Sequence, residues 1–190
     1  GLRLTGPEMR HRDYQKEHLP AGLRPSVAAA MAWLSQPSAE DVFVDPLCGS
    51  GTILIERALL GWHHQLLGGD IATEAVAAAA ENLGPRHKPR QLFLWDARAL
   101  PLATDSVSKV ATNLPFGVQL STPAEIPALY RQVVAELARV VVSGGTVVTL
   151  SARGGLLRQI AHETGRFYST TMLPVEVLGQ SAQISVLKKA

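Results

Sequence analysis

The feature of this sequence that most constrains its fold is the alternation of short apolar segments with stretches of helical periodicity. Apolar segments typical of strands cover residues 42–45, 65–70, 91–95, 107–113, 145–150, 167–175 and 182–188. Helices are predicted from Pro25 to residue 34, over 53–60, from an N-cap at Thr73 to 83, within 123–142, and over 156–162. Helices between successive strands imply parallel crossovers, so the pattern predicts an α/β, Rossmann-like doubly wound sheet. The last two strands have no helix between them and are expected to pair antiparallel at one edge.

Composition limits the chain to one domain of ordinary globular character. It has 190 residues, of which 46% are apolar and 18% charged, which excludes disorder for most of its length. No apolar run is long enough to span a membrane. Residues 1–24 are polar and mixed in charge, so they are expected to form an N-terminal arm or linker ahead of a single domain over 25–190.

Charge and cysteine content restrict the environment and the partners. The formal net charge of +2 permits an anionic partner but is far below that of a dedicated nucleic-acid-binding domain. Cys48 is the lone cysteine and no signal peptide opens the sequence, so a cytoplasmic location is expected. The adjacent His63 and His64 lack further metal ligands at suitable spacing, so we expect a surface turn and no metal.

A glycine-rich loop, DPLCGSGT over residues 45–52, lies between a predicted strand and a predicted helix. Such glycines permit a tight turn and the approach of a ligand to the backbone. Asp70 ends the next strand 19 residues after Gly51, where an acid can accept hydrogen bonds from the ribose hydroxyls of an adenosine cofactor. The loop therefore predicts a nucleoside cofactor, the alternative being a purely structural turn.

The charges around this loop favour S-adenosylmethionine over a dinucleotide. A third glycine would be expected where Leu54 stands, and Asp45 would oppose the phosphates of a dinucleotide. No lysine follows the glycines, which excludes a phosphate-clamping P-loop. Asp45 suits instead the cationic amino-acid end of S-adenosylmethionine. Asp96 ends the third strand and is expected near the adenine amino group, with a backbone contact from Ala97; a turn-forming Asp96 is the alternative.

A second loop, NLPFG over residues 113–117, ends the fourth strand in the crevice where doubly wound sheets bind ligands. The Asn113 amide oxygen and the Leu114 carbonyl are each placed to accept one N–H of an exocyclic base amine and to direct its lone pair at the methyl group. Pro115 stiffens the loop, and Phe116 offers a flat face for stacking the base. Taken alone, the pentapeptide is more typical of a structural turn, but its position after a cofactor loop, at the end of the fourth strand, favours a substrate loop.

These motifs together resemble those of class I amino-methyltransferases. Residues 19–25 (LPAGLRP), followed by an alanine-rich helix, narrow the resemblance to the catalytic domain of THUMP-associated tRNA guanine-N2 methyltransferases, the UPF0020-like family. The resemblance covers residues 10–188. It implies a seven-stranded sheet of order 3-2-1-4-5-7-6 with strand 7 antiparallel, and a catalytic pair of Asn113 and Phe116. The residues expected to contact the cofactor are Arg24, Asp45, Pro46, Cys48, Gly49, Gly51, Thr52, Asp70, Ile71, Asp96, Ala97 and Asn113; those of the catalytic loop are Asn113, Leu114, Pro115 and Phe116.

The expected reaction is methyl transfer from S-adenosylmethionine to N2 of a guanosine in tRNA. Leu114 stands where DNA adenine methyltransferases carry a proline, which weakens the resemblance to those enzymes. Methylation of guanine N2 in rRNA and of adenine N6 in DNA remain alternative reactions. A non-catalytic RNA- or partner-binding module is the alternative of another class. No THUMP domain precedes the matched region, so the chain is expected to be part of a longer protein whose RNA-binding domain helps to hold tRNA.

Cys48, Trp33 and Trp95 are expected to pack inside the domain.

Overall fold

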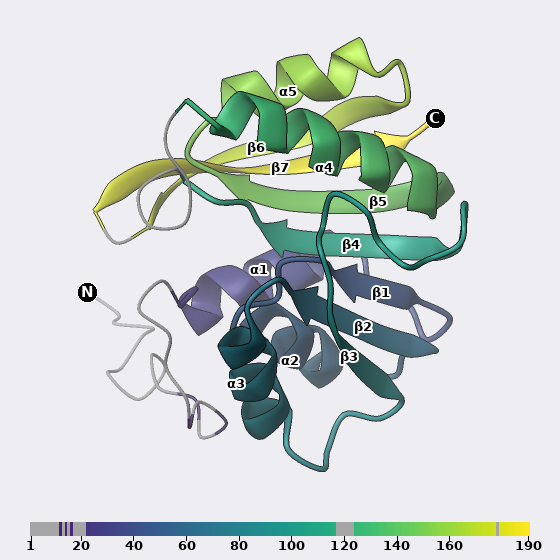
Figure 1. The fold of residues 1–190 in the computed structure, drawn as a ribbon, viewed down its shortest axis with the longest axis vertical. Helices are drawn as coiled ribbons and strands as arrows, with labels where there is room; N and C mark the ends of the chain where they lie inside the picture. Colours follow the sequence, from purple (N-terminus) through teal and green to yellow (C-terminus); the bar gives the residue numbers. More distant parts are fainter. Residues whose placement is uncertain (1–11, 13, 15, 17–21, 117–123, 178) are drawn as a thin grey trace, which may run out of the picture.

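The computed structural model describes residues 12, 14, 16, 22–116, 124–177 and 179–190. Helices and strands alternate along most of this part of the chain (Figure 1). The helices are α1 Pro25–Leu34, α2 Thr52–Leu59, α3 Thr73–Leu83, α4 Ile126–Val140 and α5 Gly154–Glu163. The strands are β1 Val42–Asp45, β2 Gln65–Asp70, β3 Arg90–Leu94, β4 Val107–Asn113, β5 Val141–Ser151, β6 Phe167–Val177 and β7 Gln180–Lys189.

The strands of the described chain form one seven-stranded sheet of order β3-β2-β1-β4-β5-β7-β6. The strands from β3 to β5 pair in parallel, with Val44 opposite both Leu67 on β2 and Val110 on β4. Strand β7 runs antiparallel to β5 and to β6. The sheet order and the antiparallel strand expected from the sequence are therefore confirmed, and the fold is that of class I methyltransferases.

Two hydrophobic cores lie on opposite faces of the sheet. One packs α4 and α5 against β4, β5 and the segment after β3, with Tyr130, Val133 and Leu157 at its centre. The other packs α1, α2 and α3 against β1 and β2, with Met31, Phe43 and Leu54 fully or almost fully buried. A three-layer sandwich of this kind leaves the carboxyl ends of the parallel strands open for a ligand.

Three local predictions from the sequence are wrong. Thr73 is the first residue of α3 rather than its N-cap. The N-cap is Ala72, whose N–H donates to the Asp70 carboxylate, so the helix begins one residue earlier than predicted. Trp33 is 68% exposed, since Ala28, Met31 and Ala32 form the buried side of α1. His63 is buried although His64 beside it is exposed. Trp95 and Cys48 are buried, as expected.

The expected arm over 1–24 lies mostly outside the described residues. Of its members, Arg12 and Tyr14 both bond the buried Glu56 carboxylate on α2, at 3.0 and 2.6 Å. The Lys16 N–H donates to Asn82 on α3, and Asn82 in turn donates to the Ser50 carbonyl in the glycine-rich loop. In the described chain, no helix is long and apolar enough to cross a bilayer.

Candidate active site

The polar residues singled out in the sequence gather at the carboxyl ends of the parallel strands. Asp45 ends β1, Asp70 ends β2 and Asn113 ends β4. These three strands are neighbours in the sheet, and their tips lie on the same side of the molecule (Figure 1). The topology therefore brings residues far apart in the sequence to one edge.

The glycine-rich loop between β1 and α2, here named the cofactor loop (residues 46–51), is fixed by hydrogen bonds of its own backbone. The Cys48 N–H donates to the Gly69 carbonyl at 2.9 Å, and the Gly51 N–H donates to the Cys48 carbonyl at 2.8 Å. The Gly49 N–H donates to the Asp70 carboxylate at 3.0 Å. Hydrogen bonds therefore hold the loop against the end of β2 without a ligand.

Glycine is required in this region for two different reasons. Gly51 has φ +80°, and a Cβ there would lie 3.2 Å from the Cβ of Ala79, so it permits both the turn and the approach of α3. Gly49 has φ +50° and an added Cβ would meet nothing within 4 Å. The space above Gly49 is therefore open to a ligand, whereas Gly51 serves the packing of the helices.

Asp45 is the most constrained acid of the site. It is 1% exposed; its Oδ1 accepts the Leu47 N–H at 3.3 Å, and its Oδ2 has no hydrogen-bond partner within the described residues. The pKa of this carboxyl is raised to about 7, mainly by burial and to a smaller extent by the negative charge of Asp70, while Thr112 and the Leu47 N–H favour the charged form and limit the rise. A buried carboxylate oxygen without a partner fits a cationic ligand group, such as the ammonium of S-adenosylmethionine.

Asp70 is half-buried, and both of its oxygens already accept backbone N–H groups, from Gly49 and Ala72. A carboxylate offers about four lone-pair directions, so it can still accept hydroxyls of a ribose. The next residue, Ile71, is 65% exposed. Its apolar side chain lies next to the acid expected to accept the ribose hydroxyls, and its contact with the cofactor stays a prediction.

The end of β3 differs from expectation in the partner of Asp96. Its carboxylate is bound by the Arg98 guanidinium through Nε at 2.9 Å and Nη2 at 2.5 Å, and it also accepts the Arg98 N–H. The hydrogen bonds from Arg98 lower the pKa of Asp96. An adenine amino group would share this carboxylate with Arg98. Ala97 is buried, and its contact with the cofactor stays a prediction.

Trp95 braces the cofactor loop from the other side. Its indole Nε1 donates to the Pro46 carbonyl at 3.0 Å, and its ring stacks on Phe93 with centroids 5.1 Å apart. A Cβ on Gly69 would lie 2.4 Å from this indole, so β2 needs glycine there to admit it. Sequence analysis assigned Trp95 to the core but missed this hydrogen bond.

The second loop, here named the substrate loop (residues 113–116), follows β4. The Leu114 N–H donates to the Leu150 carbonyl at 2.9 Å, which continues the pairing of β4 with β5. The Asn113 Oδ1 is buried and has no hydrogen-bond partner in the described part of the chain. Phe116 is half-buried and packs against the core beneath α1 and α2. Gly117, the last residue of the predicted motif, lies outside the described residues.

A hydroxyl relay that sequence analysis missed supports the substrate loop. The fully buried Tyr130 on α4 donates its hydroxyl to the Pro115 carbonyl at 2.9 Å and lies 2.9 Å from Ser151 Oγ. Ser151 Oγ accepts the Arg153 N–H at 2.8 Å, so its own proton is free to bond Tyr130. Burial raises the pKa of Tyr130, which keeps the phenol protonated as a donor. The available signal was Ser151 at the carboxyl end of the strand beside β4.

The same helix also holds the segment that follows Asp96. Glu136 accepts the Leu100 N–H at 2.6 Å, and Arg139, paired with Glu136, donates to the Leu100 and Leu102 carbonyls at 3.0 and 2.8 Å. Helix α4 therefore supports the substrate loop at one point and the segment after β3 at another.

The remaining predicted residues have less direct roles. Thr52 begins α2 with its hydroxyl 3.4 Å from that of Ser50, and Cys48 packs below the cofactor loop. Burial raises the pKa of the Cys48 thiol, which keeps it an inert packed group. Arg24 is exposed at the N-cap of α1, and no side-chain bond joins it to the site in the described structure. The described residues hold no group of three or more potential metal ligands.

Comparison with protein families places this geometry in context. Residues 12–177 match the family UPF0020, described as an RMKL-like methyltransferase domain. Among solved structures, TrmN from Thermus thermophilus superposes with a TM-score of 0.80 at 27% identity, covering 94% of this chain and 53% of that one. A putative RNA methyltransferase from Pyrococcus horikoshii superposes with a TM-score of 0.72 at 20% identity, covering 95% and 88%, and shows the shared fold.

Two curated relatives from Bos taurus are similar over most of this chain. One is U6 snRNA (guanine-N(2))-methyltransferase THUMPD2, 36% identical over 133 residues, which are 68% of this chain and 26% of the relative. The other is tRNA (guanine(6)-N(2))-methyltransferase THUMP3, 33% identical over 153 residues, which are 74% of this chain and 30% of that relative. The chain therefore spans between a quarter and a third of the length of these relatives.

Proposed function

Because this chain belongs to the UPF0020 family of RMKL-like methyltransferase domains, we propose that it transfers a methyl group to the exocyclic N2 of a guanosine in tRNA. Its fold is that of S-adenosylmethionine-dependent methyltransferases, and its relatives include guanine-N2 methyltransferases of RNA. The proposal concerns the catalytic step, since the chain covers only a part of those relatives.

One observation carries the proposal. Two buried oxygens, Asp45 Oδ2 and Asn113 Oδ1, stand without hydrogen-bond partners in the described structure at the carboxyl ends of adjacent strands. An unpaired buried acceptor is costly unless a ligand supplies its donor. A carboxylate beside an amide oxygen suits a site that takes a cationic amino acid on one side and an amine with N–H groups on the other.

The residues that would hold S-adenosylmethionine are those of the cofactor loop and the ends of β1 to β3. Asp45 would accept the ammonium, Gly49 would leave room for the ligand, and Asp70 would accept the ribose hydroxyls. Ile71 and Asp96 would border the adenine. When bound, this cofactor supplies a methyl group on a sulfonium, which is a strong electrophile and needs no further activation.

The substrate loop would orient the target amine. Asn113 Oδ1 and the Leu114 carbonyl would each accept one N–H, which draws the nitrogen toward tetrahedral geometry and directs its lone pair at the methyl group. The Pro115 carbonyl already accepts the Tyr130 hydroxyl, so it supports the loop instead of contacting the amine. Phe116 would stack on the base, a contact worth about 1–3 kcal/mol. The surplus proton leaves the nitrogen after transfer, so no strong base is required.

The assignment to tRNA rests on the relatives, while the net charge of the chain bears only on how strongly it binds RNA. THUMP3 is named for tRNA, whereas THUMPD2, at slightly higher identity, is named for U6 snRNA, which makes that RNA the second candidate. A net charge of +2 over 190 residues supplies little phosphate binding. Extruding the target base costs a few kcal/mol, so a neighbouring RNA-binding domain is expected to contribute contacts.

The division into an arm (1–24) and a catalytic domain (25–190) is part of the same proposal. The bonds from Arg12 and Tyr14 to Glu56 support an arm that lies against α2. An arm held in this way would connect the cofactor side of the domain to whatever RNA-binding unit accompanies it.

The deciding experiment is mass spectrometry of nucleosides from tRNA, U6 snRNA, rRNA and DNA after incubation with labelled S-adenosylmethionine. We expect N2-methylguanosine in tRNA. Asn113→Leu, which has the same shape without an acceptor, should lower turnover at least about 100-fold, while Asn113→Asp retains an acceptor and some activity. Both should bind S-adenosylhomocysteine normally. Label in N6-methyladenine, or in DNA only, would refute the guanine assignment, and no transfer to any substrate would favour a non-catalytic module.

A further inference from the structure

An exposed tryptophan and a short cationic segment share one surface at the amino ends of β2 and β3, remote from the active site. We name this surface the basic edge and define it by Trp62, Arg86, His87, Lys88 and Arg90. Trp62 is 83% exposed, and Arg86 and Lys88 are exposed as well. Trp62 lies in the segment before β2, residues 86–88 lie in the segment before β3, and Arg90 is the first residue of β3. The basic edge therefore lies at the amino ends of these strands, whereas the active site lies at their carboxyl ends.

The two segments lie side by side in the structure. They line one hollow of about 280 Å³, formed by Ala58, Gly61, Trp62, His63, His87 and Lys88. The Leu66 N–H donates to the Pro89 carbonyl at 3.1 Å, which ties the start of β2 to the segment before β3. The Arg90 guanidinium donates to the Gly84 and Arg86 carbonyls and so holds the turn in shape. The indole and the cations therefore occupy a common surface.

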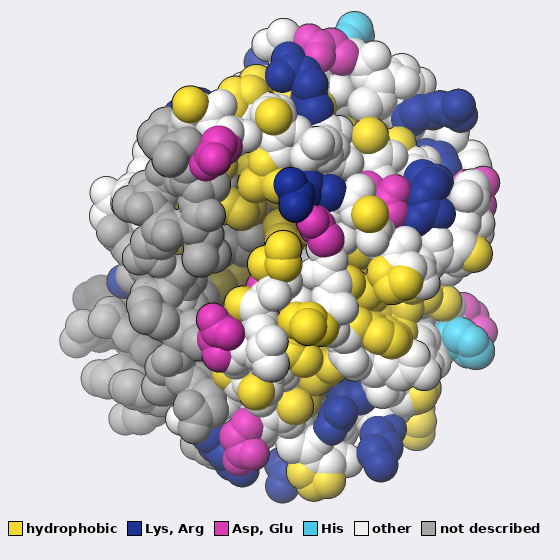
Figure 2. All heavy atoms as spheres, viewed as in Figure 1, with side chains coloured by type: hydrophobic (Ala, Val, Ile, Leu, Met, Phe, Trp, Pro, Cys, Tyr) yellow, Lys and Arg dark blue, Asp and Glu magenta, His cyan; other side chains and the backbone are white. Residues whose placement is uncertain are grey.

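The charges of the basic edge are uncompensated. No Asp or Glu occurs within residues 57–69 or 82–95 of the sequence. None of the salt bridges found in the described structure includes Arg86, Lys88 or Arg90. Burial lowers the pKa of His87, and the charges of Arg86 and Arg90 lower it further, which is the mark of a crowded positive field. Figure 2 shows Lys and Arg side chains gathered at the bottom of the molecule, where the turn between α3 and β3 lies in Figure 1.

We propose that the basic edge binds the phosphate backbone of the RNA substrate, with Trp62 stacking on an unpaired base, at a point remote from the target nucleotide. The inference rests on the proposed function, because it assumes an RNA substrate. The six residues of β2 span about 20 Å, so this contact belongs to a different part of the RNA from the methylated base. An exposed indole among cations is the arrangement that single-stranded nucleic acid selects, through stacking combined with phosphate neutralisation.

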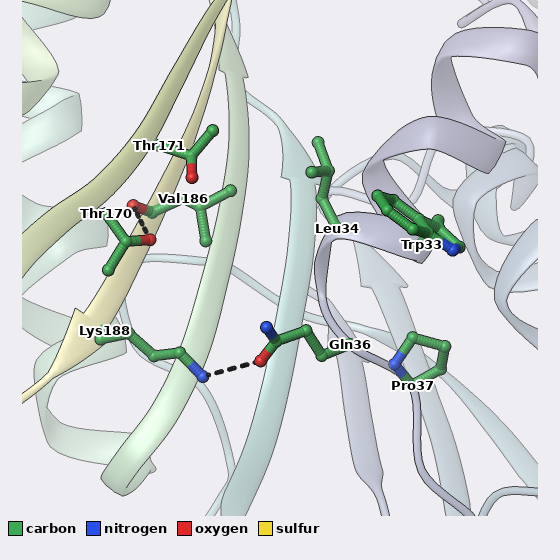
Figure 3. Close-up of a pocket in the computed structure, with 8 residues that line it drawn as sticks. All are labelled: Trp33, Leu34, Gln36, Pro37, Thr170, Thr171, Val186 and Lys188. Atoms are coloured by element: carbon green, nitrogen blue, oxygen red, sulfur yellow. Dashed lines mark hydrogen bonds between the residues drawn. The ribbon is translucent and has the colours of Figure 1, made fainter.

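The second exposed tryptophan shows why this edge is favoured. Trp33 borders a groove of about 460 Å³ between the end of α1 and strands β6 and β7 (Figure 3). Among the described residues, Lys188 is the one cation that lines that groove, and it is already bonded to Gln36 and Thr146 at 3.3 and 2.7 Å. The groove around Trp33 thus lacks the free positive charge that an RNA contact requires.

The test compares two double charge reversals by fluorescence anisotropy with labelled tRNA over a range of salt concentrations. The first is Arg86→Glu with Lys88→Glu in the basic edge. The matched control is Arg158→Glu with Arg166→Glu on and after α5, two exposed cations without a salt bridge in the described chain. Both pairs change the net charge equally. Only the first should weaken tRNA binding, by about tenfold, and reduce the salt slope by about 1.5.

Trp62 supplies an independent readout. Trp62→Ala should weaken tRNA binding about fivefold or more, and Trp62→Phe should restore most of it because a ring is kept. Bound tRNA should also protect Lys88 from acetylation by acetic anhydride. Equal losses of tRNA affinity in the two charge-reversed pairs, or no protection of Lys88 by bound tRNA, would overturn the proposal. If wild-type chain binds and methylates tRNA while the basic-edge variants behave normally, the basic edge is wrong and the proposed function stands.

Discussion

The cofactor loop and the substrate loop end adjacent strands of one sheet, yet they are held in different ways. The cofactor loop is fixed at several points: its backbone bonds β2 and closes the turn, and the side chains of Asp70, Trp95 and Asn82 bond further backbone groups of the loop. The substrate loop is fixed by side chains that arrive from elsewhere, namely Tyr130 on α4 and Ser151 at the end of β5.

This difference separates two requirements of a bisubstrate site. A loop held at several points, in part by its own backbone, keeps N–H groups and space available for a ligand. A loop held by a buried hydroxyl depends on one side chain for its carbonyl direction, although the backbone bond from Leu114 to Leu150 fixes its start. We therefore expect variants to separate cofactor binding from methyl transfer, and the following tests can break or sharpen that separation.

The largest effect is expected from Asp70→Ala. The change removes the acceptor proposed for the ribose and also releases the Gly49 N–H from its partner, so the cofactor loop keeps only the bond from Cys48 to Gly69 as its link to β2. Affinity for S-adenosylhomocysteine, measured by calorimetry, should fall at least about tenfold. Glu74→Ala, which removes an exposed carboxylate from the first turn of α3, is the matched control and should leave affinity unchanged. Normal binding by Asp70→Ala, or heat from NAD, would contradict the cofactor assignment.

A smaller effect is expected from pH, through Asp45. Since burial raises the pKa of its carboxyl to about 7, most molecules carry a neutral Asp45 at pH 6 and a charged one at pH 8. A cationic ligand group favours the carboxylate, so affinity for S-adenosylhomocysteine should rise with pH, by up to about tenfold between pH 6 and pH 8, with proton release on binding. Asp45→Asn cannot ionise and should give weak, nearly pH-independent binding. The same pH dependence in wild type and Asp45→Asn would show that another group is responsible.

The smallest effect is expected from Tyr130→Phe, which keeps the ring and removes only the hydroxyl. The Pro115 carbonyl and Ser151 each lose a partner, which should cost about 1–2 kcal/mol of unfolding free energy. With the loop less firmly aimed, kcat should fall about threefold while affinity for S-adenosylhomocysteine is unchanged. Tyr168→Phe, at an exposed tyrosine of β6, should change neither quantity. Loss of cofactor binding in Tyr130→Phe would mean that the two loops are not independent.

The same contrast explains what the sequence could predict. The signal for strand β1 and its glycine-rich loop is local, because the apolar run, the acid and the glycines lie within residues 42–51. Asp45 and Gly49 were therefore placed correctly in the fold, and Asp70 was placed by the end of the next apolar run. The hydroxyl of Tyr130 bonds Pro115, which lies 15 positions before it, and Ser151, which lies 21 positions after it. No spacing rule selects that tyrosine from the buried face of helix α4. Trp33 was misplaced because apolar character alone does not reveal which side of a short helix faces the sheet.

Helix α4 gives the site a fixed internal scale. Tyr130 bonds the loop that would hold the target amine, while Glu136 and Arg139 bond the segment after Asp96, the acid proposed to border the adenine. Six residues separate Tyr130 from Glu136, which places the two attachment points about 9 Å apart along the helix axis. A helix is far stiffer than a loop, so thermal motion shifts both attachments together. The loop proposed to hold the amine and the segment after the acid proposed to border the adenine are thus attached to one helix, which would keep the distance between them constant.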